Sequence, residues 1–206
     1  MLTQRPDQRV AVFIDTQNMY HSAKHIFNRK VSFANLVEAA VGPRILTRAI
    51  AYVAKSKDNA EQGFFDALQQ QGIELKIKDV QEFSSGAKKA DWDVGMAVDA
   101  IALSPKVDVI VLVTGDGDFV PLVEYLKGHG VICEVAAFKE STNAKLREVA
   151  DSFLDLSAEP DQFLIPDGRP GTKRPAIRQS DKPMNEKHKT PPTPSKGPGR
   201  NIRITY

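Results

Sequence analysis

Apolar residues along this 206-residue chain alternate between short continuous runs and stretches of helical periodicity. The continuous runs are rich in β-branched residues and have the length of a strand that is buried on both faces. Between them, apolar positions recur every three or four residues, as they do on one side of a helix. This alternation is typical of a parallel sheet with helices on both faces.

The individual elements follow from these patterns and from the residues that end them. Gly72 and Gly128 each follow a helical stretch, and Ser104-Pro105 ends another. We predict strands at residues 10–14, 46–53, 73–77, 107–113 and 131–137, and a last short run at 152–156. We predict helices at residues 18–27, 33–40, 60–71, 93–103, 120–127 and 143–150.

Right-handed crossovers restrict the order in which these strands pair. The order 3-2-1-4-5 is the natural closure, and it makes the first and fourth strands neighbours. The predicted fold is a three-layer α/β/α domain, Rossmann-like, with a central parallel sheet of about five strands. In such sheets the functional site lies at the carboxyl ends of the strands where the order reverses, here between the first and the fourth.

Composition divides the chain near residue 160. From there on, ten Lys and Arg residues stand against four Asp and Glu, a net charge of +6, which leaves −4 for residues 1–159. The same stretch holds nine of the thirteen prolines. Such a composition cannot bury enough apolar surface to offset its ordering entropy. We therefore predict one folded domain over 1–159 and a disordered, basic, proline-rich tail over 160–206 that binds nucleic acid.

The chain lacks the features of a membrane or secreted protein. No apolar stretch approaches the roughly 20 residues that cross a bilayer, and the N-terminal sequence MLTQRPDQRV has no apolar signal-peptide core. Cys133 is the only cysteine, which excludes an internal disulfide and a thiolate metal cluster. We expect a cytoplasmic protein with no membrane partner.

Carboxylates stand where the predicted strands end. The run at residues 107–119, VDVIVLVTGDGDF, ends in Asp116 and Asp118, and Asp15 directly follows the first apolar run. Asp93 opens the helical pattern that leads into the fourth strand. The strand order places Asp15 beside the Asp116/Asp118 pair. Several carboxylates at one edge are the ligands that a hard cation such as Mg²⁺ or Mn²⁺ prefers.

Each of these acids also has a purely structural explanation. Asp15 precedes a helical run and is a candidate N-cap, and Asp118 is a candidate cap for the helix that follows it. Asp91 is a better cap for the middle helix than Asp93, which leaves Asp93 as the better ligand. Asp99 lies about 240° around that helix from Asp93, so we assign it a structural or supporting role.

Basic and aromatic residues near the same edge are candidates for contacts with a polynucleotide. Lys55, Lys88 and Lys89 could hold phosphates, and the alternative is that they are solvated surface lysines. Trp92 lies between two acids at a helix start and could stack on a base. The alternative for Trp92 is packing against the end of the sheet.

Three blocks carry a resemblance to a known family. They read FIDTQN at residues 13–18, KADWDVGMAVD at 89–99 and TGDGDF at 114–119. In this order and spacing they resemble the NYN domain family, the LabA-like branch of the PIN-like nuclease superfamily, over about residues 9–156. The resemblance implies a PIN-like fold and a ribonuclease that uses Mg²⁺ or Mn²⁺ and gathers its acids at the end of the central sheet.

The resemblance also implies roles for single residues. The implied metal ligands and catalytic acids are Asp15, Asp93, Asp116 and Asp118, of which we assign Asp15 and Asp116 as the innermost pair. Asn18 matches the polar partner that orients the substrate phosphate or a water. Thr114 and Gly117 replace two serines of the family's Ser-Gly-Asp-Ser-Asp-Phe pattern. Thr114 keeps a hydroxyl that could contact substrate, whereas Gly117 removes one.

The function implied is endoribonucleolytic cleavage by in-line attack of a metal-activated water on an RNA phosphodiester. The alternative is a regulatory RNA- or protein-binding module that keeps the fold but does not cut. A phosphatase or nucleotide-binding protein lacks support, because neither an Asp-x-Asp motif after the first strand nor a glycine-rich phosphate loop is present. The substrate RNA, the number of metals and the formation of a homo-oligomer stay open.

Overall fold

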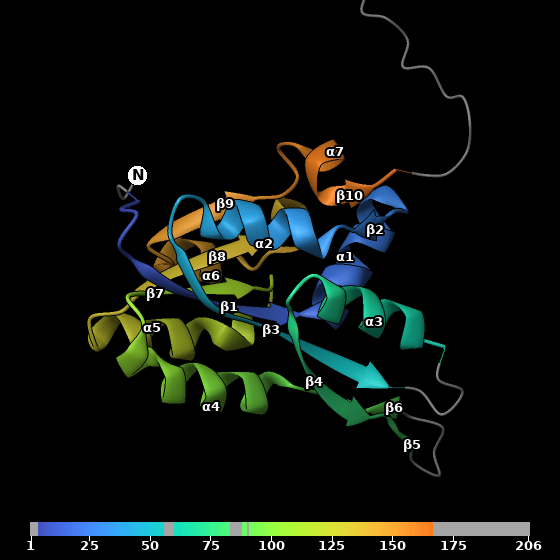
Figure 1. Ribbon diagram of the computed structural model, residues 1–206, viewed down its shortest axis with the longest axis horizontal. Helices are drawn as coiled ribbons and strands as arrows, with labels where there is room; N and C mark the ends of the chain where they lie inside the picture. The colour runs from blue at the N-terminus through green and yellow to red at the C-terminus, as the bar shows by residue number, and fades with distance from the viewer. Residues whose placement is uncertain (1–3, 56–59, 83–87, 90, 167–206) are drawn as a thin grey trace, which may run out of the picture. The chain divides into compact units, whose positions relative to one another are not determined.

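The main sheet confirms the predicted class and strand order. The computed structural model describes residues 4–55, 60–82, 88–89 and 91–166. The strands are β1 (Arg9–Asp15), β3 (Ile45–Lys55), β4 (Glu74–Asp79), β7 (Val109–Val113), β8 (Ile132–Ala137) and β9 (Ser152–Asp155). They pair in parallel in the order β4-β3-β1-β7-β8-β9 (Figure 1). The sixth strand, β9, is the last short apolar run, which adds to the edge beside β8.

Helices cover both faces of this sheet, as the sequence predicted. The helices are α1 (Thr16–Phe27), α2 (Phe33–Val41), α3 (Gln62–Gln70), α4 (Asp93–Leu103), α5 (Val120–Gly128) and α6 (Ala144–Val149). Side chains of β1 alternate between the two cores: Val12 packs with α1, α2 and α3, and Phe13 packs with α4, α5 and α6. None of the described helices combines the length and apolarity that crossing a bilayer requires.

Several short elements complete the described part of the chain. Strand β2 (Lys30–Val31) pairs antiparallel with β10 (Leu164–Ile165), and β5 (Gln81–Glu82) pairs with β6 (Lys88–Lys89). Helix α7 (Pro160–Phe163) precedes β10, and 3-10 turns lie at Ser104–Lys106, Gly117–Phe119 and Lys139–Ser141. Two-residue strands carry no periodic pattern, which is why sequence did not reveal them.

The ordered fold extends past the boundary expected at residue 159. Phe163 and Leu164 are buried in the same core as β1, and they hold α7 and β10 on the domain. Arg29 also donates to the carbonyl of Leu164 and to the carboxylate of Asp161. The folded region therefore includes residues 160–166. The rest of the predicted tail, from residue 167, lies outside the described residues.

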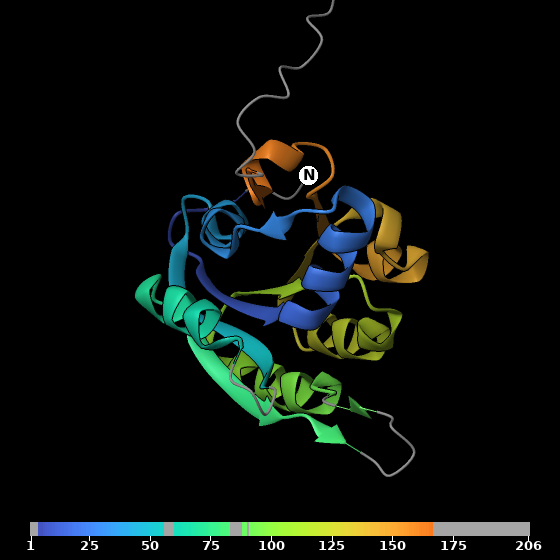
Figure 2. The same ribbon diagram turned by 90° about the vertical axis from the view of Figure 1, so that its right-hand side faces the viewer.

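The parallel arrangement gives the sheet two chemically different edges. At the amino-terminal edge, Arg9 and Asp108 form an ion pair between β1 and the start of β7. A buried pair, Arg44 with Glu134, ties the loop after α2 to β8. The carboxyl edge, which Figure 2 shows from its side of the molecule, carries the predicted acids. Stabilising ion pairs and candidate functional groups are thus separated along the strands.

Candidate metal centre

Asp15 ends β1 and caps the helix that follows. Its Oδ1 atom accepts a hydrogen bond from the backbone N–H of Asn18 at 3.0 Å, and its Oδ2 accepts from the Thr114 hydroxyl at 3.4 Å. The cap explanation considered for Asp15 is therefore correct for its local geometry. The same two contacts fix the orientation of the carboxylate at the carboxyl edge of the sheet.

The turn after β7 is held from two sides. Thr114 is fully buried, and its hydroxyl oxygen also accepts from the N–H of Asp116 at 3.2 Å. The side-chain oxygen of Asn18 accepts from the N–H of Gly115 at 2.9 Å. Thr114 and Asn18 thus connect the end of β1 to the turn that carries Asp116. Both residues have a clear positioning role here, in addition to the substrate contacts predicted for them.

The absence of a side chain at Gly117 has a steric explanation. A Cβ atom built on Gly117 would lie 2.4 Å from the Nδ2 atom of Asn143, which is too close without movement of that side chain. Asn143 caps α6 through its side-chain oxygen and donates its N–H to the carbonyl of Gly115 at 2.9 Å. The space beside Gly117 is therefore occupied by Asn143. Sequence analysis did not connect Asn143 with this turn, because the two are far apart in the chain.

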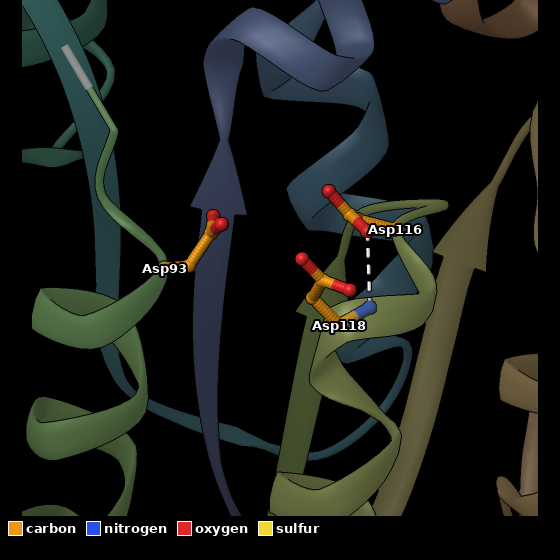
Figure 3. A group of neighbouring side chains, drawn as sticks. All are labelled: Asp93, Asp116 and Asp118. Carbon is orange, nitrogen blue, oxygen red and sulfur yellow. Dashed lines mark hydrogen bonds between the residues drawn. The ribbon is translucent and has the colours of Figure 1, made fainter. Parts of the chain in front are cut away.

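Asp116 and Asp118 form the second half of the site. The Oδ1 atom of Asp116 accepts from the N–H of Asp118 at 3.0 Å and so caps the short 3-10 turn. Asp116 is half-buried, whereas Asp118 is exposed. Asp118 does not cap α5 (Val120–Gly128), as had been considered, because the N-cap of that helix is Phe119, which makes no capping side-chain bond. This leaves the Asp118 carboxylate directed into the site (Figure 3).

Asp93 enters from the opposite side, at the first residue of α4. Its N–H donates to Oδ1 of Asp91 at 2.9 Å, although the N-cap position of α4 is Trp92 and not Asp91 as predicted. Trp92 donates its indole N–H to the carbonyl of Val53 at 3.0 Å and lies edge-on to Tyr52. These contacts favour the packing explanation for Trp92. They also anchor the start of α4 against β3 and fix where Asp93 stands.

Three carboxylates converge at this point. Oxygen atoms of Asp93, Asp116 and Asp118 all lie within 4.8 Å of one another. Figure 3 shows Asp93 facing the other two across the end of β1. Asp15 is not part of this group, and its two oxygens accept hydrogen bonds from the Asn18 N–H and the Thr114 hydroxyl. The trio therefore differs from the Asp15 and Asp116 pair that the sequence placed innermost.

The electrostatics of Asp93 and Asp15 are consistent with a shared acidic site. Burial, with repulsion from Asp91, Asp116 and Asp15, raises the pKa of Asp93 to about 6. Burial also raises the pKa of Asp15; the Asn18 N–H opposes this effect, and the charge of Asp116 adds to it. Gathering these charges is unfavourable unless a proton or a cation compensates them. The donor set, oxygen alone, fits a hard divalent ion such as Mg²⁺ or Mn²⁺.

The other predicted residues lie at varying distances from the trio. Asp99 accepts from the Tyr52 hydroxyl at 2.7 Å and from Lys76, with which it forms a 2.6 Å ion pair, so its role is structural. Lys55 ends β3 at the same edge of the sheet and is half-buried. The backbones of Lys88 and Lys89 form β6, whereas their side chains lie outside the described residues. Contacts of these lysines with RNA stay a prediction.

Comparison with known proteins agrees with this geometry. The model of the NYN domain matches residues 9–157. The Low amplitude and bright protein LabA of Synechococcus elongatus is 30% identical over 161 residues, which cover 72% of this chain and 84% of the relative. An uncharacterised protein of Methanocaldococcus jannaschii is 29% identical over 155 residues, which cover 74% of this chain and 57% of that protein.

A solved structure extends the comparison to three dimensions. The crystal structure of a protein of unknown function from Vibrio parahaemolyticus superposes with a TM-score of 0.71 at 29% identity, covering 80% of this chain and all of that chain. The match over residues 9–157 spans every strand of the main sheet and all four acids. This chain belongs to the NYN domain family, within the PIN-like superfamily.

Proposed function

We propose that this protein is a metal-dependent ribonuclease that hydrolyses RNA phosphodiester bonds at the acidic trio. One observation carries the proposal: Asp93 meets Asp116 and Asp118 within 4.8 Å although more than twenty residues separate them in the chain. The edge of the sheet on which they meet is where open α/β folds place their chemistry. The nuclease-like fold of the NYN domain supports the same conclusion.

Asp93, Asp116 and Asp118 are the residues that would hold the metal. When bound, a divalent ion would supply positive charge against the phosphoryl oxygens and would make a nearby water more acidic. The protein's own contribution is to gather three carboxylates at a partly exposed edge that a phosphodiester can approach. The backbone that bears these side chains is held by two hydrogen bonds. The Asp118 N–H donates to the Asp116 carboxylate, and the Asp93 N–H donates to the Asp91 carboxylate.

Asp15 and Asn18 complete the proposed site. Because the Asn18 N–H and Thr114 hold the Asp15 carboxylate in place, we assign it to orient the attacking water for in-line displacement. The side-chain oxygen of Asn18 is bound to the turn, so its Nδ2 group is the part assigned to donate to a phosphate oxygen. Lys55, at the same edge, would bind a neighbouring phosphate.

The test is cleavage of labelled single-stranded RNA in Mn²⁺, with EDTA as the metal-free condition. Wild-type protein should cut, and Asp116→Asn and Asp15→Asn should each lower the rate by at least about 100-fold. Both variants should stay folded, since an asparagine oxygen caps a helix as well as aspartate does. The matched control is Asp66→Asn, which removes a charge from the exposed side of α3.

Two results would overturn the proposal. One is Mn²⁺-dependent cleavage that persists in both site variants, which would place the reaction elsewhere. The other is RNA binding by the wild-type protein without any metal-dependent cleavage, which would favour the non-cleaving regulatory module. Far-ultraviolet circular dichroism of each variant distinguishes loss of the site from loss of the fold.

A further inference from the structure

A recess opens at the carboxyl edge of the sheet, on the side of α1 and α3. It has a volume of about 550 Å³ and lies between α1 and α3 at the carboxyl ends of β1 and β3. Thr16 and Gln17 line it, and these residues directly follow Asp15 in the chain. Its volume falls in the range of about 300–1,000 Å³ that is usual for small-molecule sites. The recess therefore begins at the two residues that follow Asp15 in the chain.

Exposed aromatic rings face this recess from two helices. Tyr20 and His21 of α1 line it and form an edge-to-face pair, with ring centroids 5.4 Å apart. Phe64 of α3 also lines it and packs at 5.7 Å against Phe33. The side chains of Tyr20 and Phe64 remain 51% and 38% exposed. Flat aromatic surface left open to water in a concave site is typical of a binding surface.

The charges of the lining favour an uncharged occupant. Lys30 and Glu61 both line the recess and carry opposite charges, so these two residues together add no net charge to its lining. An anion such as a free phosphate gains little there. The amide of Gln17 offers a donor and an acceptor at the side nearest Asp15. A flat, neutral ring with polar edges suits this combination of stacking faces and one amide.

We propose that the recess binds a nucleobase of the RNA strand whose phosphodiester lies at the acidic trio. The base stacks on Tyr20 and Phe64, and the Gln17 amide bonds to its edge. This inference rests on the proposed function, because it takes RNA as the molecule bound at the acidic trio. A base enters such a recess only when it is unstacked from its neighbours, so the protein should prefer single-stranded RNA over a duplex.

The test compares two labelled strands in a binding titration, with Ca²⁺ present and Mn²⁺ absent. One is a short single-stranded RNA, and the other is a strand of equal length made of abasic ribonucleotides. Loss of one stacking ring should weaken RNA binding by about 10-fold in Tyr20→Ala and in Phe64→Ala. Neither substitution should change affinity for the abasic strand, because no base is present to stack. Leu46→Ala is the control, since Leu46 is 43% exposed at the amino-terminal start of β3 and lines neither the recess nor the acidic trio.

The proposal is overturned if Tyr20→Ala and Phe64→Ala bind RNA as tightly as wild type does. It is equally overturned if they lose the same affinity for both strands, since the effect would then lie in the backbone contacts or the fold. The titration is independent of cleavage. RNA that binds with the expected dependence on Tyr20 and Phe64, but is never cut in Mn²⁺, would refute the ribonuclease proposal and leave the base site intact.

Discussion

Replacing Asp93 by asparagine should stabilise the metal-free domain at neutral and alkaline pH. The pKa of this carboxyl is raised from 3.8 to about 6, because burial and the neighbouring acids disfavour its charge. A group whose pKa is higher in the folded state stabilises the fold fully below its unfolded pKa. That contribution is lost as the pH rises through 6. Asparagine stays neutral and avoids this loss.

The size of the effect follows from the pKa. A change from 3.8 to about 6 corresponds to roughly 3 kcal/mol, but solvent screens a half-exposed carboxyl, and about 1 kcal/mol is the reasonable expectation. In a domain of this size, that is an increase of roughly 2–4 °C in the melting temperature. The increase should appear at pH 8 in EDTA and disappear below pH 4. Mn²⁺ should then stabilise the wild type more than the variant.

Thermal melts followed by circular dichroism at pH 4, 6 and 8 measure this. Asp108→Asn is the control of opposite sign: bonds from Arg9 lower the pKa of Asp108 to about 2, so removing its charge should destabilise the domain at pH 8. If Asp93→Asn lowers the melting temperature at pH 8 in EDTA, or has no pH-dependent effect, the acids are not gathered as described.

Four other substitutions test the framework around the site. Glu134→Leu should cost about 3–5 kcal/mol in urea unfolding, because it leaves the buried Arg44 guanidinium without its charged partner; a loss below 1 kcal/mol would contradict this. Gly117→Ala should displace the Asn143 side chain and weaken Mn²⁺ binding in calorimetry. Adding Asn143→Gly to this variant should restore the affinity. Unchanged affinity in Gly117→Ala alone would show that the turn has room for the methyl group. Asn18→Ala should lower stability by about 1 kcal/mol and Mn²⁺ affinity by about 10-fold, and an unchanged affinity would remove its positioning role.

Much of the fold could be predicted because long apolar runs identify buried strands. Residues 109–113 and their counterparts at 10–14 are buried on both faces, and helix periodicity located the six main helices to within about two residues at each end. Right-handed crossovers restricted the order of the strands, and the common order of mononucleotide-binding sheets completed the prediction. The short strands and the end of the domain could not be predicted from these patterns. Phe163 and Leu164 lie in a stretch whose average composition is that of a solvated tail, and only their tertiary contacts show that they are buried.

The site was predictable in its position but not in its grouping. Strand ends and topology bring Asp15 and Asp116 to one edge, which residue spacing could show. Which carboxylate oxygens converge depends on side-chain contacts between segments that are far apart in the chain. The Asp15 carboxylate accepts hydrogen bonds from the Thr114 hydroxyl and the Asn18 N–H, whereas α4 brings the Asp93 carboxylate close to that of Asp118. The recess beside α1 was not foreseen either, since its aromatic residues have the spacing of ordinary helix faces.

Direct measurement of Mn²⁺ binding is the decisive experiment for the acidic trio. Calorimetric titration should show binding by the wild type. The affinity should fall by about 100-fold in Asp93→Asn, Asp116→Asn and Asp118→Asn alike, because each replaces a charged carboxylate of the same cluster by a neutral amide. Asp99→Asn, on the other side of α4, should bind as the wild type does. Equal affinity in the trio variants and the wild type would mean that these carboxylates do not form a metal site.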